Sequence, residues 1–232
     1  MNIKYIQKTT LIDFPGQIAS TIFVGGCNFN CDFCYNQALL EKHHEIPNVS
    51  EEKIISLLEN RKKFIDGIAI TGGEPTVQKR LIPFIKEIKK IGFQVKLDTN
   101  GYRPDVLQEI INQDLVDYIA MDIKAPLSKY SDIARVEINS ELIKESINLL
   151  KQSNTKYEFR TTVYKGICNQ EDFENMFMLA KDAEQYFLQN FYTPDEIQEE
   201  SKFKAVTKKE ISPILEIGKK YVQNIELRGD WY

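Results

Sequence analysis

The sequence has little cysteine, little histidine and no excess of basic charge, and each shortage excludes a class of protein. Four cysteines and two histidines occur in 232 residues. A small secreted scaffold would be rich in cysteine, so a disulfide framework is excluded. The net charge is −4, so no large basic surface is available to neutralise a phosphate backbone. We therefore expect no nucleic-acid partner.

Long apolar runs are also missing. No stretch approaches the ~18 residues that a membrane-spanning helix needs, and residues 1–10 are too polar to form the apolar part of a signal peptide. We therefore expect a cytoplasmic protein with no membrane partner. The hydrophobic fraction of 42% and the charged fraction of 28% are ordinary for a globular protein that buries a core, and the length favours one larger domain.

Short apolar runs alternate with longer amphipathic runs from residue 18 onward, which is typical of repeated βα units. The expected strands are residues 18–24, 67–71, 93–98, 117–123, 157–164, 185–191 and 222–227. The expected helices are residues 51–64, 77–91, 105–113, 140–152, 172–182 and 208–221, with Ser50 as an N-cap and Gly92 as a C-terminal glycine. This alternation predicts parallel strands joined by right-handed crossovers.

Seven strands and six helices are too few for a closed eightfold barrel, which usually has ~250 residues. We therefore predict an α/β fold with a partial, laterally open (β/α)6 barrel, and a doubly wound open sheet is the alternative. Residues 18–232 would form one domain, and residues 1–17 an N-terminal extension packing on the barrel. In either architecture ligands collect at the carboxyl ends of the strands, so the loops that follow them are the candidate site.

Three of the four cysteines fall within eight residues, directly after the first expected strand. Cys27, Cys31 and Cys34 have the spacing C-x3-C-x2-C. Three thiolates on one tight loop can hold three corners of a cubane iron–sulfur cluster and leave the fourth iron without a protein ligand. An open metal position is typical of a catalytic site.

From the residues alone, two other kinds of metal site remain as alternatives. A zinc site needs four ligands, and the remaining candidates are Cys168, His43 and His44. An electron-transfer ferredoxin site would need a fourth cysteine, and Cys168 stands alone in the sequence. With no neighbouring cysteine or cationic run, Cys168 is interpreted as an incidental thiol.

The C-x3-C-x-aromatic-C pattern after the first strand of a partial barrel resembles the signature of the radical SAM superfamily. The resemblance extends over nearly the whole chain. It implies a [4Fe-4S] cluster on the three cysteines and S-adenosylmethionine as the second cofactor. Thr71-Gly72-Gly73-Glu74-Pro75 follows the second strand and would by itself be only a turn. The resemblance implies that Gly72, Gly73 and Glu74 bind the methionine ammonium of S-adenosylmethionine.

The ends of the third and fourth strands, residues 96–101 and 118–126, resemble the corresponding strands of glycyl radical activating enzymes. The resemblance implies a monovalent cation beside the methionine carboxylate, bound by Asp98, Thr99, Asp122 and the Ala120 carbonyl. Oxygen ligands suit a hard cation. From the residues alone, Asn-Gly is a common turn, and Asp122 with Lys124 could be a simple ion pair at a strand end.

Three further residues are candidates for cofactor binding. The resemblance implies that Phe33 contacts the adenine, although it could also shield the cluster from water. Arg160 lies within an apolar strand and needs a partner, which could be a carboxylate or ribose of the nucleoside or a structural ion pair. Gln189 lies near the end of the sixth expected strand.

Residues 9–16 resemble the N-terminal segment of the activating proteins of class III anaerobic ribonucleoside-triphosphate reductase. The chain departs from that subgroup at Tyr35, where a histidine often follows the third cysteine. The resemblance implies a radical SAM activase that forms a glycyl radical on a partner enzyme and takes electrons from a low-potential donor such as flavodoxin or ferredoxin. No catalytic acid or base is then required. A small-molecule radical SAM enzyme of the deazapurine type and a non-catalytic zinc-binding module are the alternatives.

Overall fold

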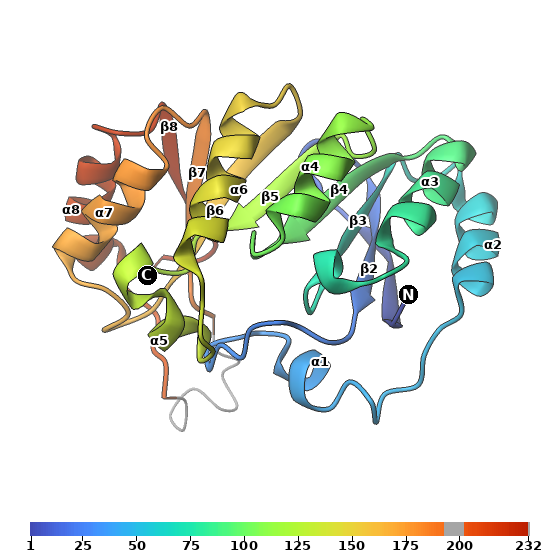
Figure 1. Ribbon diagram of the computed structural model, residues 1–232, viewed down its shortest axis with the longest axis horizontal. Coiled ribbons are helices and arrows are strands. Elements are labelled where there is room, and N and C mark those ends of the chain that lie inside the picture. The colour runs from blue at the N-terminus through green and yellow to red at the C-terminus, as the bar shows by residue number, and fades with distance from the viewer. Residues whose placement is uncertain (193–201, 232) are drawn as a thin grey trace.

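A computed structural model describes residues 1–192 and 202–231. All the strands in these residues belong to one curved sheet. Its strands follow one another in sequence order (Figure 1). They are β1 (Ile3–Thr10), β2 (Ala19–Val24), β3 (Gly67–Gly72), β4 (Gln94–Thr99), β5 (Tyr118–Asp122), β6 (Lys156–Val163), β7 (Gln185–Asn190) and β8 (Asn224–Arg228). Each pair from β2–β3 to β7–β8 is parallel, whereas β1 is antiparallel to β2. All seven expected strands are therefore present.

The longer helices follow one another along the outside of the curve (Figure 1). The α-helices are α1 (Gln37–Glu41), α2 (Glu51–Arg61), α3 (Leu81–Ile91), α4 (Pro104–Asn112), α5 (Tyr130–Ala134), α6 (Ser140–Gln152), α7 (Gln170–Leu179) and α8 (Lys208–Gly218). Two 3-10 turns are η1 (Pro75–Val77) and η2 (Leu127–Lys129). The strand order of a doubly wound sheet reverses at a switch point, and this order does not. The doubly wound alternative is wrong, and the open partial barrel is confirmed.

Toward the carboxyl ends of β5 and β6, alternation separates an outer apolar face from an inner polar one. In β5, Ile119 and Met121 are fully buried, whereas Asp122 lines an inner cavity. In β6, Phe159 is likewise buried and Arg160 lines the same cavity. Because successive side chains of a strand point to opposite faces, the apolar residues lie toward the helices and the polar ones toward the interior of the barrel.

The first 17 residues contain a strand that the sequence analysis did not predict. In β1, exposed Tyr5, Lys8 and Thr9 interrupt the buried and half-buried residues, as expected of an edge strand, and this mixture hides the strand signal. After β1, Phe14 is almost fully buried, with its ring 6.2 Å from that of Tyr118. A Cβ on Gly67 would also collide with the Phe14 ring. Since Gly67 and Tyr118 begin β3 and β5, Phe14 closes the amino end of the barrel.

Helix ends follow local capping chemistry. The Ser50 hydroxyl accepts the Lys53 N–H, and Gly92 adopts the left-handed conformation, as predicted. The helix expected over 77–91 begins only at Leu81, because Pro83 has no N–H and is tolerated in the first turn of a helix. The helix expected over 51–64 ends at Arg61.

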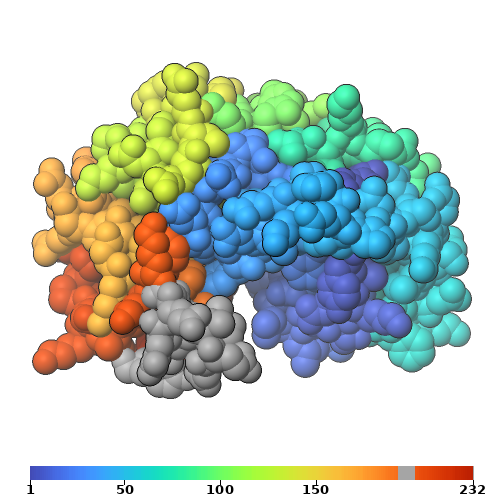
Figure 2. Space-filling model, turned by 90° about the horizontal axis from the view of Figure 1, so that it is seen from below, coloured from blue at the N-terminus to red at the C-terminus, as the bar shows by residue number. Residues whose placement is uncertain are grey.

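The side of the barrel between β1 and β8 is open, since these strands are the two edges of the sheet. Figure 2 shows a hollow beside the dark-blue N-terminal strand, bordered also by the blue segment that follows β2. Over residues 1–192 and 202–231, no helix has both the length and the apolarity to cross a membrane.

Candidate active site

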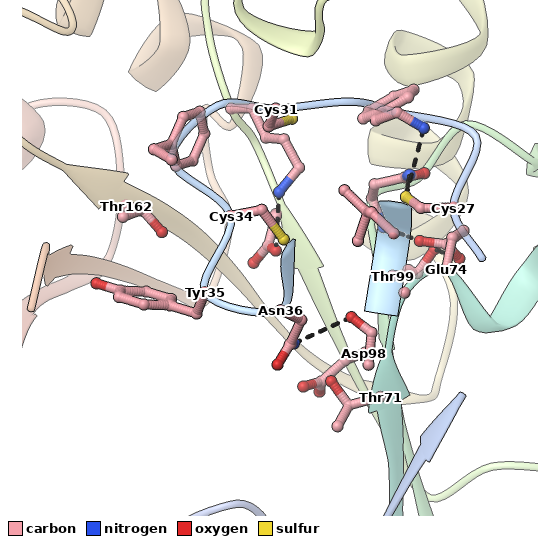
Figure 3. A pocket seen from close by; sticks show the side chains of 18 of the residues that line it. Cys27, Cys31, Cys34, Tyr35, Asn36, Thr71, Glu74, Asp98, Thr99 and Thr162 are labelled. Carbon is pink, nitrogen blue, oxygen red and sulfur yellow. Dashed lines mark hydrogen bonds and ion pairs between the residues drawn. The ribbon is translucent and has the colours of Figure 1, made fainter. Parts of the chain in front are cut away.

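A cavity of about 250 Å³ lies at the carboxyl ends of the parallel strands, and part of its lining is drawn in Figure 3. It brings together all the side chains and glycines that the resemblance assigned to the cluster, S-adenosylmethionine or the cation, together with Arg160 and Gln189. They are Cys27, Cys31, Phe33, Cys34, Gly72, Gly73, Glu74, Asp98, Thr99, Asp122, Arg160 and Gln189. Ala120 lies two residues before Asp122 within β5 and does not line the cavity.

The three cysteines of the loop after β2 are largely buried beside the cavity. Cys31 is 5% exposed, and its carbonyl accepts the Cys34 N–H at 3.1 Å. The Cys27 sulfur accepts the Phe29 N–H at 3.3 Å. Burial, together with the charge of Glu74, raises the pKa of Cys27 to about 12, and burial also raises the pKa of Cys31 and Cys34. Thiolates at these positions therefore call for a positive partner, which an iron centre supplies.

The other candidate metal ligands do not line the cavity, although His43 packs against Gly25 and Gly26, just before Cys27. Cys168 does not line the cavity, and burial beside Asp172 raises its pKa to about 12. His44 is exposed beside Glu45. In the described part of the chain, no three His, Cys, Asp or Glu side chains are arranged to hold a single metal ion. The donor set at the cavity is thus three thiols from one loop, which fits a cluster with one iron left open to a further ligand.

Two glycines let the end of β3 approach the cysteine loop closely. The Gly73 N–H donates to the Val24 carbonyl at 2.7 Å, and the Glu74 N–H donates to the Gly26 carbonyl at 2.9 Å. A Cβ on Gly73 would lie 2.1 Å from the Gly26 oxygen, and one on Gly72 would lie 2.5 Å from the Val24 oxygen. Side chains at both positions are excluded by backbone contact with the segment that leads into Cys27.

Glu74 is 1% exposed, and its carboxylate accepts four hydrogen bonds. Oε1 accepts the Thr76 N–H at 2.9 Å, the Thr76 hydroxyl at 2.5 Å and the Thr99 hydroxyl at 2.8 Å. Oε2 accepts only the Asn100 N–H, at 2.7 Å. Burial raises the pKa of Glu74, while these donors favour its ionised form. Since a carboxylate oxygen has two lone pairs, Oε2 can accept a further donor from the cavity.

Asp98 and Asp122 are bridged by the guanidinium of Arg160. Arg160 Nε lies 2.8 Å from Asp122 Oδ1, and Nη1 lies 3.4 Å from Asp98 Oδ2. Lys96 pairs with the other oxygen of Asp98, and Lys124 with that of Asp122 at 3.2 Å. Burial opposes ionisation of Asp122, but the charges of Arg160 and Lys124 outweigh it and lower the pKa to about 2. Arg160 thus has the ion-pair partners that its position in an apolar strand requires.

Phe33 lies among aromatic rings at the edge of the cavity. Its ring centroid is 5.2 Å from that of Tyr164 and 6.4 Å from that of Phe203. The Lys124 ammonium lies 5.8 Å from the Phe33 centroid. Phe33 is 6% exposed, so its ring is almost fully buried beside the cysteine loop. Contact with an adenine stays a prediction.

Several residues that border the cavity were not assigned a role from the sequence. Tyr35, which follows the third cysteine, donates its hydroxyl proton to the Asn190 carbonyl at 3.2 Å and accepts the Tyr192 N–H at 2.7 Å. Asn36 donates to the Gly72 carbonyl at 3.0 Å. The cysteine loop is therefore tied to β7 on one side and to β3 on the other. Asn100 also lines the cavity; its Asn-Gly sequence signals only a turn.

Comparison with known proteins agrees with this site. Residues 21–180 match the family model of the radical SAM superfamily. A Methanocaldococcus jannaschii protein with the provisional name glycyl-radical enzyme activating enzyme is 35% identical over 229 residues, covering 96% of this chain and 94% of that protein. A second protein from the same organism, with the same provisional name, is 30% identical over 91% of this chain and 81% of its own length.

Solved structures share the fold at low identity. Streptococcus suis SuiB has a TM-score of 0.68 and 13% identity, over 88% of this chain and 47% of that one. TYW1 with a bound lysine-pyruvate adduct has a TM-score of 0.61 and 20% identity, over 87% of this chain and 73% of that one. The family model covers well over half of the chain, and the chain is similar along nearly its whole length to the first of the two M. jannaschii proteins. This chain belongs to the radical SAM superfamily and is an enzyme that uses a [4Fe-4S] cluster and S-adenosylmethionine.

Proposed function

We propose that the chain is an activase that generates a glycyl radical on a partner enzyme, namely anaerobic class III ribonucleoside-triphosphate reductase. The observation that carries the proposal is the near full-length similarity to a protein provisionally named as a glycyl-radical enzyme activating enzyme. The choice of this reductase rests on the resemblance of residues 9–16. The electron donor of the activase would be a flavodoxin or ferredoxin, and the activase would be cytoplasmic.

In this proposal Cys27, Cys31 and Cys34 hold the cluster. When bound, the two cofactors supply an electron that breaks the sulfonium bond and a 5′-deoxyadenosyl radical that abstracts hydrogen from a glycine Cα. The protein binds and orients the cofactors and excludes water. The free lone pair of Glu74 Oε2 accepts the methionine ammonium, and the close approach of Gly72 and Gly73 to the cysteine loop sets that carboxylate beside Cys27.

Asp98, Thr99, Asp122 and the Ala120 carbonyl are proposed to bind a monovalent cation near the methionine carboxylate. The carboxylate oxygens of both aspartates already pair with Lys96, Arg160 or Lys124. A bound cation would therefore share or displace at least one of these side chains. Dependence of S-adenosylmethionine affinity on K⁺ or Na⁺, measured against choline chloride at equal ionic strength, tests this site.

The open side of the barrel suits a peptide substrate that enters laterally. The proposed adenine contact, Phe33, borders the same cavity as Arg160 and Gln189, so a nucleoside bound there could contact all three side chains. A glycine on a projecting loop of a large partner could reach this position, because the barrel has strand edges at β1 and β8 rather than a closed wall.

The decisive experiment is anaerobic reconstitution followed by reaction with the reductase. The protein should contain about four irons per chain, consistent with a [4Fe-4S] cluster. Dithionite with S-adenosylmethionine should give 5′-deoxyadenosine, and the added reductase should show a glycyl electron paramagnetic resonance doublet. Cys31→Ala should abolish iron binding and cleavage, whereas Cys168→Ala should keep both. Retained cleavage in Cys31→Ala would refute the ligand assignment.

A small-molecule radical SAM enzyme is the second candidate. A 7-carboxy-7-deazaguanine synthase of Thermococcus kodakarensis is 28% identical over 156 residues, covering 58% of this chain and 60% of that protein. Cleavage of S-adenosylmethionine without a glycyl doublet on the reductase would favour this candidate over the activase. The zinc-module alternative predicts one zinc and no iron or sulfide, which metal analysis decides.

A further inference from the structure

We propose that Asn100 is a positioning residue that raises the reduction potential of the cluster through a hydrogen bond to the Cys27 sulfur. The inference rests on the proposal that Cys27 is a cluster ligand. It does not depend on which substrate the enzyme attacks. Asn100 directly follows β4, is 4% exposed and lines the cavity.

The orientation of the Asn100 amide is fixed by its neighbours. Its Oδ1 accepts the Tyr102 N–H at 3.0 Å, so its Nδ2 points the other way. That nitrogen donates to Asn28 Oδ1 at 2.8 Å and lies 3.9 Å from the Cys27 sulfur. Exchanging the amide oxygen and nitrogen would set a donor against the Tyr102 N–H. The hydrogen-bond network therefore assigns a donor, and not an acceptor, to the side facing Cys27.

The same residue also holds the carboxylate beside Cys27. Its backbone N–H donates to Glu74 Oε2 at 2.7 Å. Figure 3 shows Glu74 and Cys27 next to each other at the cavity. Asn100 thus contacts the first cysteine through its side chain and Glu74 through its backbone, and it links the proposed cluster corner to the proposed ammonium site.

A thiolate strengthens this contact. A neutral thiol is a weak acceptor, whereas a sulfur that carries negative charge forms a charge-assisted hydrogen bond. Reduction makes a cluster more negative, so a donor to its sulfur stabilises the reduced form more than the oxidised form and raises the potential. The Phe29 N–H, at 3.3 Å, acts on the same sulfur but belongs to the backbone. Asn100 supplies the side-chain donor that substitution can remove.

The test is a redox titration of the reconstituted protein without S-adenosylmethionine, followed by electron paramagnetic resonance. Asn100→Ala should lower the equilibrium constant for cluster reduction about tenfold, which is 59 mV for one electron. Asn30→Ala changes an exposed asparagine of the same loop and should leave that constant within about twofold of the wild-type value. An unchanged potential in Asn100→Ala would overturn the inference.

Two further measurements keep the outcome interpretable. Full iron content in Cys27→Ala would refute the assignment of Cys27 as a cluster ligand. If Cys27→Ala loses iron but the potential of Asn100→Ala is unchanged, only the inference about Asn100 is refuted. If Asn100→Ala does not fold, wild-type protein with ¹⁵N in the side-chain amides of asparagine replaces it. Pulsed electron paramagnetic resonance should then detect a weak ¹⁵N coupling to the reduced cluster, and no coupling would overturn the inference.

Discussion

Replacing Gly73 by alanine should disrupt the cysteine loop without changing any side chain proposed to bind a cofactor. The new Cβ would lie 2.1 Å from the Gly26 oxygen, and real Cβ contacts are essentially never shorter than 3.0 Å. One backbone segment must therefore move by about 1 Å. Both segments carry proposed ligands, since Gly26 precedes Cys27 and Gly73 precedes Glu74.

The expected cost follows from two effects. Overpacking against backbone costs about 1–3 kcal/mol, and loss of the Glu74 N–H bond to the Gly26 carbonyl costs about 1 kcal/mol more. The free energy of unfolding of the metal-free protein should thus fall by about 2–4 kcal/mol in urea titrations. Iron content and S-adenosylmethionine affinity should fall as well, because Cys27 and Glu74 are displaced relative to each other.

Gly166→Ala is the matched control. Gly166 has a φ of +84° and nothing within 4 Å of an added Cβ, so its substitution strains the backbone but meets no neighbour. It should cost about 1–2 kcal/mol of stability and leave iron content unchanged. Wild-type iron content and S-adenosylmethionine affinity in Gly73→Ala would refute the argument that backbone approach at this point positions the site.

Three further predictions concern the surroundings of the site. Tyr35→Phe removes the acceptor of the Tyr192 N–H, and hydrogen exchange at that amide should quicken about 2–10-fold; an unchanged rate would show that the hydroxyl does not tie the loop to β7. The pKa of Asp122 is about 2 instead of 3.8, so its ionisation should contribute about 2 kcal/mol of stability that is present above pH 4 and lost as the pH falls toward 2. Arg160→Met should remove most of this pH dependence of the free energy of unfolding, and a pH profile identical to that of the wild type would contradict the pairing. Phe14→Ala should lower the free energy of unfolding by about 3–5 kcal/mol in urea, and a loss below 1 kcal/mol would show that Phe14 does not close the barrel.

Periodicity predicted the repeated βα units because strands such as β3 are covered on both faces and read as continuous apolar runs. It missed β1, whose exposed side chains dilute the apolar signal, and it extended the helix before Gly92 back to residue 77. Pro83 sets the start of α3, because a proline is tolerated only in the first turn of a helix. The sequence does not show which residues form that first turn, so this constraint could not be applied in advance.

The residues of the candidate site also divide into those that the sequence identified and those that it did not. Cys27, Cys31 and Cys34 were found by spacing, and Gly73 and Glu74 by the resemblance to the radical SAM superfamily. Partners such as Thr99 and Asn100, which hydrogen-bond to Glu74 from the end of β4, could not be found, because they lie about 25 residues away in the sequence.

No local pattern sets Arg160 between the two aspartates of β4 and β5, or Tyr35 against the end of β7. The first arrangement depends on the register of β4, β5 and β6, in which Asp122 lies opposite Arg160.

The arrangement around Glu74 implies that the cysteine loop and the glycine-rich turn act as one unit. The Gly26 carbonyl accepts the Glu74 N–H, and Asn100 joins Glu74 to the Cys27 sulfur. The two backbone contacts to Glu74 measure 2.9 Å and 2.7 Å, and the Asn100 side chain lies 3.9 Å from the sulfur, so a displacement at one motif is transmitted to the other. Substitutions at Gly73 and Asn100 should therefore be non-additive: the double variant should lose less cluster stability than the two single losses predict, since both substitutions loosen the coupling between the same two motifs. Additive losses would mean that the two motifs bind their cofactors independently.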